Sequence, residues 1–152
     1  MIREIESTTI SREDPFSIEV DLGHPTYDPD GISGELSLEP GWAWRQGARL
    51  GGVTKTSSRW HGQLAEGSGS SEYEQALAQV ISFLTQHEHF IAEFTSGGGE
   101  IEIVLNHAAV DVPEGIALDL QLTPVLLAHL ANHNIGLRVR AWSNNPSWNA
   151  AR

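Results

Sequence analysis

Apolar and polar residues alternate strictly along residues 16–22, and this alternation constrains the fold more than any other feature of the sequence. The pattern returns in 100–107 and in 116–122, where isoleucine and leucine take alternate positions. Because successive side chains of a β-strand point to opposite faces of a sheet, these segments predict strands with one buried and one wet face. Further strands are expected at 42–50 and 59–64, as a hairpin, and at 137–142.

Two helices are indicated by a polar N-cap residue that precedes a proline. Asp28 stands before Pro29, and Thr123 stands before Pro124. Proline suits the first turn of a helix because its missing N–H would have had no partner there. The two helices are expected to end near Leu38 and near Asn134.

A third and longer helix is expected to follow a capping box formed by Ser71 and Glu74. In that motif, the serine hydroxyl and the glutamate carboxylate each accept a hydrogen bond from the other residue's free backbone N–H. Apolar residues then recur at helical spacing as far as 97–99, and we interpret them as one buried stripe. These residues are Tyr73, Leu77, Val80, Leu84, Ile91 and Phe94.

The expected element order is therefore β-α-β-β-α-β-β-α-β, with many strands adjacent along the chain. This order favours an α+β fold with a mostly antiparallel sheet and helices on one face. The first six elements predict a ferredoxin-like βαββαβ core, extended by a final βαβ. We expect a flexible N-terminal segment at 1–14, a single domain at 15–142 and a loose tail at 143–152.

The composition excludes several classes of function. The net charge of −11 argues against nucleic acid and against an anionic membrane surface, because both are bound mainly through clustered Lys and Arg. The absence of cysteine excludes disulfides, thiolate metal sites and cysteine nucleophiles. No secretory signal or membrane-spanning run is recognisable, so a cytoplasmic location is expected. Eight arginines against the single Lys55 are typical of a bacterial, GC-rich source.

A cluster of tryptophan and arginine is the candidate ligand or partner surface. Both residue types are enriched at binding hot spots, and the cluster spans the predicted hairpin. The other interpretation is that the tryptophans belong to the core. The members are Trp44, Arg45, Arg49, Arg59 and Trp60.

No catalytic or phosphate-binding motif is present, and the sequence predicts no catalytic residues and no cofactor. His129 and His133 lie four residues apart on a predicted helix, the spacing of two metal ligands, but no third ligand can be named and no metal site is assigned. Glu100 and Glu102 share one face of a strand, and their alternation with isoleucine indicates the wet face.

Four motifs occur in order along residues 16–142: 28–32 leading into Leu-Ser-Leu-Glu-Pro at 36–40, Trp-Arg-Gln-Gly at 44–47, Ser-Arg-Trp at 58–60, and the leucine-rich 120–130. Together they resemble the bacterial domain-of-unknown-function family 4279. Trp142 takes the place of the aromatic residue that ends the family pattern. The resemblance implies a small cytoplasmic bacterial domain and assigns no activity.

Two functional hypotheses follow from these observations. The first is a non-enzymatic binding domain for a protein partner, a basic one given the acidic chain, with the neutralisation of a toxin as one form of it. The alternative is a small-ligand-binding protein or an enzyme whose site is lined by Trp and Arg.

Overall fold

The computed structural model describes residues 8–9, 15–109, 118–119 and 121–143. Its centre is a five-stranded sheet with the lateral order β3-β6-β2-β7-β9. Only the pairing of β7 with β9 is parallel. The strands are β3 (Trp42–Trp44), β6 (Ser58–Ser68), β2 (Pro15–His24), β7 (Glu100–Ala109) and β9 (Gly136–Ser143).

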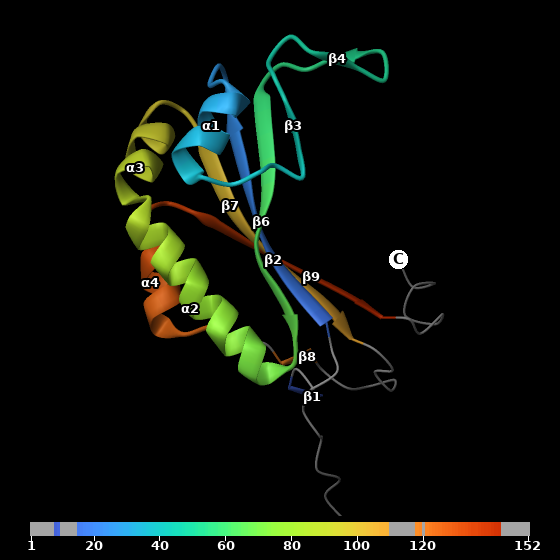
Figure 1. Ribbon diagram of the computed structural model, residues 1–152, viewed down its shortest axis with the longest axis vertical. Helices are drawn as coiled ribbons and strands as arrows, with labels where there is room; N and C mark the ends of the chain where they lie inside the picture. The colour runs from blue at the N-terminus through green and yellow to red at the C-terminus, as the bar shows by residue number, and fades with distance from the viewer. Residues whose placement is uncertain (1–7, 10–14, 110–117, 120, 144–152) are drawn as a thin grey trace, which may run out of the picture.

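Four helices lie on the same side of this sheet, as Figure 1 shows. They are α1 (Pro29–Leu36), α2 (Ser70–Gln86), α3 (Glu88–Ser96) and α4 (Pro124–Asn132). The expected α+β class with a mostly antiparallel sheet is confirmed. None of the described helices is long and apolar enough to cross a membrane.

The helix starts follow the capping chemistry in two cases out of three. The Asp28 side chain accepts a hydrogen bond from the backbone N–H of Asp30, and Thr123 accepts one from Leu126, so both predicted N-caps are confirmed. The predicted capping box at 71–74 is wrong. Helix α2 has Gly69 as its N-cap with no side-chain cap, because the chain turns into the helix earlier; Glu72 Oε2 instead accepts the N–H of Ser68 at 2.6 Å.

The segment between the first two helices differs from the expected hairpin. Of the first strand expected for this hairpin, only the part that forms β3 pairs with β6. The chain then forms a separate two-stranded ribbon of β4 (Arg49–Leu50) and β5 (Val53–Thr54), which projects from one end of the sheet in Figure 1. Gly51 and Gly52, both at positive φ, close this ribbon. The expected strand at 42–50 is interrupted earlier, between β3 and β4, by a turn in which the Ala48 N–H donates to the Arg45 carbonyl at 3.0 Å.

Two more expectations changed. The apolar stripe of 73–94 is divided between α2 and α3, which meet at His87. Of the expected strand at 116–122, the structure describes β8 (Leu118–Asp119), which pairs in parallel with β1 (Thr8–Thr9). The predicted flexible segment 1–14 and the tail 143–152 lie outside the described residues, apart from β1 and the last residue of β9.

One apolar core fills the space between the sheet and the helices. Strand β2 points every second side chain into this core. The apolar stripe predicted for 73–94 faces the core from α2 and α3. Its most deeply buried large side chains include Ile18, Leu22, Trp60, Leu84, Phe94, Ile103 and Leu126.

Candidate functional site

The face of the sheet that points away from the helices, called here the uncovered face, gathers most of the polar side chains of the central strands. The register places Glu19, Gln63 and Val104 in one row across three strands, and Asp21, His61 and Glu102 in the next. The two edge strands add aromatic and basic groups to these rows. The uncovered face includes Ser17, Glu19, Asp21, Trp42, Trp44, Arg59, His61, Gln63, Glu66, Glu100, Glu102, Val104, Asn106, Arg138 and Arg140.

His61 is held between two carboxylates at the middle of this face. Its Nδ1 is hydrogen-bonded to Asp21, and its Nε2 lies 3.3 Å from an Oε2 of Glu19. The three side chains are only 15 to 21% exposed. Asn106 completes the group by donating to the same Glu19 oxygen at 2.7 Å and to Ser17 Oγ at 3.2 Å.

The His61 ring is also the inner end of an aromatic stack. Trp42 lies parallel to it, with ring centroids 5.0 Å apart and an angle of 3° between the planes. Trp44 stacks on Trp42 at 4.8 Å, and the Lys55 ammonium lies 4.6 Å from the Trp44 ring centroid. Such a stack is favoured electrostatically because a cation is attracted to an aromatic face. Trp42 nevertheless stays 43% exposed.

A hollow of about 570 Å³ opens next to these residues, on the part of the face nearest the start of β7. Asp21, Arg59, Glu100, Glu102 and Arg138 supply its charged walls. Two of these groups pair with each other, since Arg138 Nε lies 3.0 Å from Glu102 Oε1. The volume is within the range of small-ligand sites.

The structure separates the five residues that the sequence suggested as one surface. Trp44 and Arg59 lie opposite each other on β3 and β6 and belong to the uncovered face. Trp60 points the other way and is fully buried, and its indole Nε1 donates to Ser33 Oγ of α1 at 2.9 Å. Successive side chains of a strand point to opposite faces of the sheet, which is why Arg59 and Trp60 lie on different faces.

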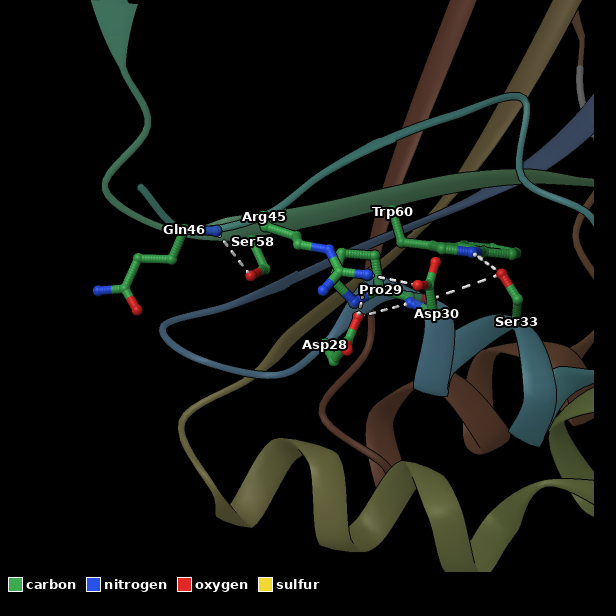
Figure 2. Close-up of polar contacts among 8 residues, drawn as sticks. All are labelled: Asp28, Pro29, Asp30, Ser33, Arg45, Gln46, Ser58 and Trp60. Carbon is green, nitrogen blue, oxygen red and sulfur yellow. Dashed lines mark hydrogen bonds and ion pairs between the residues drawn. The ribbon is translucent and has the colours of Figure 1, made fainter. Parts of the chain in front are cut away.

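Arg45 and Arg49 lie elsewhere. Figure 2 shows the Arg45 guanidinium reaching over the start of α1, where it pairs with Asp28 at 3.3 Å and with Asp30. It thereby ties the segment after β3 to α1. Ser58, the first residue of β6, holds the same segment to the sheet, since its Oγ accepts the N–H of Gln46 at 3.0 Å (Figure 2). Arg49 is exposed on the β4-β5 ribbon.

Sequence reasoning missed His61, Glu19, Asp21 and Trp42. The signal for three of them was present: the alternation in 16–22 puts both carboxylates on the wet face, and Trp42 lies two residues before Trp44 on one strand. The contact of His61 with Asp21 joins residues 40 positions apart and had no local signal.

The chain matches no protein-family model, no curated protein and no solved structure. The chemistry of the site therefore has to be taken from its geometry. Both ring nitrogens of His61 face carboxylates of the chain itself, so the imidazole presents no nitrogen to a substrate. A general base needs one within hydrogen-bond reach of the proton that it removes.

The histidine pair on α4 does not form a metal centre in the described part of the chain. The rings of His129 and His133 are stacked with centroids 6.3 Å apart, and His133 Nε2 lies 3.8 Å from Glu88. Among the described residues, no three histidine, aspartate or glutamate side chains form a group that could hold a metal ion.

Proposed function

We propose that this chain is a non-enzymatic binding domain that receives its partner on the uncovered face of the sheet. One observation carries the proposal: a face that none of the described helices covers presents the Trp42 and Trp44 stack beside a hollow with charged walls. Tryptophan offers a large contact area with little conformational entropy to lose, and it is enriched where binding energy concentrates.

The internal pairing of the face supports binding over catalysis. His61 is engaged by Asp21 and Glu19, and stacking fixes its ring plane. A surface whose side chains are held in place before a partner arrives loses less entropy on binding. The same engagement leaves His61 without the free nitrogen that acid–base chemistry needs.

A basic protein is the partner that the charge of the chain favours. The net charge of −11 attracts a cationic protein over distance and raises its association rate at low ionic strength. Neutralisation of a basic toxin would be one use of such a surface. The hollow beside the tryptophans supports the alternative of a small ligand.

A ferredoxin-like core remains part of this proposal, as does the expected element order. The lateral order β3-β6-β2-β7, antiparallel throughout, supports such a core, with α4 and β9 as its extension. The resemblance to family 4279, the bacterial source and the cytoplasmic location also remain predictions.

Site-specific photo-crosslinking tests the proposal. A benzophenone amino acid replaces Trp42 on the uncovered face or, as a matched control, the exposed Gln79 on the outer side of α2. In cells of the source organism, we expect one defined protein adduct from position 42 and none from position 79. Adducts of equal pattern from both positions, or none from position 42, would overturn the proposal.

A further inference from the structure

The charged walls of the hollow contain two groups of opposite sign that have no partner among the described residues. Asp21 pairs with His61, and Glu102 pairs with Arg138. Arg59 and Glu100 form no ion pair and no side-chain hydrogen bond within the described residues. They are therefore the two charges of the hollow that a ligand can meet without breaking an internal pair.

Arg59 and Glu100 lie in one row across the sheet with Gly23 between them. Gly23 of β2 is the register partner of Arg59 on β6 and of Glu100 on β7. Two strand spacings separate the Cα atoms of the two charged residues by about 10 Å. Their side chains can shorten this gap, so a small molecule can touch both.

Gly23 also determines where the Arg59 guanidinium lies. A Cβ at position 23 would come within 3.2 Å of Arg59 Cζ and Nε and 3.3 Å of Nη1, so the side chain rests directly on the glycine backbone. Arg59 is half-buried although it has no ion-pair partner in the described residues. Glycines 99 and 136 line the same hollow, and a Cβ at Gly136 would lie 3.7 Å from Glu102 Cγ and Oε2, so this glycine leaves the space beside Glu102 open.

From this arrangement we infer that the hollow binds a small zwitterion of the amino-acid class. The carboxylate of the ligand pairs with the fork of Arg59, a bidentate geometry that arginine favours, and its ammonium group pairs with Glu100. Three carboxylates face two guanidinium groups in the hollow, so a ligand with an additional positive charge fits better than one with an additional negative charge. L-Lysine should bind more tightly than L-alanine, and L-alanine more tightly than L-glutamate.

The inference rests on the proposed use of the uncovered face for binding, but it concerns a different part of that face. The test is a titration of the ¹⁵N-labelled chain with L-lysine, followed through the backbone amide signals of Gly23, Gly99 and Gly136. Nα-acetyl-L-lysine, which lacks the α-ammonium group, and L-lysinamide, which lacks the carboxylate, should each bind about tenfold more weakly.

Charge-neutral variants assign the two contacts. Arg59→Gln and Glu100→Gln should each weaken L-lysine binding about tenfold, the loss expected for one charge-assisted contact. Arg140→Gln on β9 and Glu66→Gln on β6 are the matched controls, since both residues are exposed and lie on the same sheet outside the hollow, and they should leave the affinity unchanged.

Gly23→Ala probes the seating of Arg59 with every charge kept. Its Cβ would displace the guanidinium, so this variant should also bind L-lysine more weakly while its urea unfolding midpoint stays near that of the parent chain. That midpoint also shows whether each glutamine variant is folded.

Several outcomes would overturn the zwitterion site. They are the absence of shifts at these glycines with L-lysine at millimolar concentration, equal binding of the blocked analogues, and unchanged binding by Arg59→Gln and Glu100→Gln. Crosslinking from position 42 is independent of this titration. A protein adduct without L-lysine binding would overturn only the zwitterion site. L-lysine binding without an adduct would overturn only the proposal of a protein partner.

Discussion

On β2, Phe16, Ile18, Val20 and Leu22 point under the helices and are at most 5% exposed, while Glu19 and Asp21 between them point to the uncovered face. The same strand thus supplies the core and the candidate site. Burial of the apolar set removes its surface from water, which stabilises the fold by about 25 cal/mol for each Å². The charged set keeps part of its hydration and is free to carry specificity.

The comparison of the two faces teaches that stability and recognition use separate side chains of the same strands. Substitutions on the covered face should change the free energy of unfolding, and those of exposed side chains on the uncovered face should act mainly on binding. His61, whose side chain is only 15% exposed, should affect both. Four predictions test that division, in order of decreasing effect on stability.

Trp60→Ala should be the most destabilising. The residue is fully buried on the covered face, and its removal leaves a large cavity and takes away the hydrogen bond that Ser33 Oγ accepts from the indole. We expect a loss of about 3–5 kcal/mol in the free energy of unfolding, measured by urea denaturation followed by circular dichroism. A loss below about 1 kcal/mol would mean that the covered face is not the core.

His61→Phe tests the histidine that lies between two carboxylates on the uncovered face. Phenylalanine keeps an aromatic ring against Trp42 but leaves Asp21 and Glu19 without the imidazole nitrogens that lie between them. We expect a loss of about 2 kcal/mol, below that of a fully buried pair because these side chains still touch water. Adding Asp21→Asn and Glu19→Gln to His61→Phe should recover most of this loss. If it does not, repulsion between the carboxylates is not its cause.

Tyr73 of α2, which packs against Phe16 of the covered face, makes a prediction about alkaline pH. Burial raises the pKa of Tyr73 to about 12, from 10.0 for a free tyrosine. The folded state therefore holds the phenol proton where the unfolded chain releases it, so stability that is complete below pH 10 falls as the pH rises toward 12.

Comparison with Tyr73→Phe isolates this effect. By pH 11 the parent chain should lose about 1.4 kcal/mol more than the variant, relative to pH 9. At pH 9 the variant should be at least as stable, since no described group hydrogen-bonds the buried hydroxyl. Parallel stability curves of the two proteins from pH 9 to pH 11 would contradict the prediction.

Trp42→Ala should change stability least. The side chain is 43% exposed, and its contacts are the Trp44 and His61 rings, so we expect a loss of less than about 1 kcal/mol. The same urea experiment as for Trp60→Ala gives the direct comparison. Equal losses in the free energy of unfolding for Trp60→Ala and Trp42→Ala would contradict the proposed division between the two faces.

Much of the fold was predictable because its signals are local. The alternation of 16–22 and the N-caps Asp28 and Thr123 depend on residues within one strand or one helical turn. The capping box failed because Ser71 and Glu74 fit the motif, but the turn before α2 places Gly69 at the N-cap. Local signals show that a helix begins nearby, but they predict the first residue of the helix less accurately.

The candidate site was less predictable because its partners are distant in the sequence. Trp60 looked like a partner of Trp44, but only the register of β3 on β6 shows that Trp44 lies opposite Arg59. The sequence alone determined the two-sided strands, the capped helices and the acidic charge, since each depends on residue type and short spacing. Only the tertiary structure decided that all four helices cover one face, that His61 meets Asp21 and Glu19, and that Arg59 rests on Gly23 facing Glu100, because strand pairing brings these residues together.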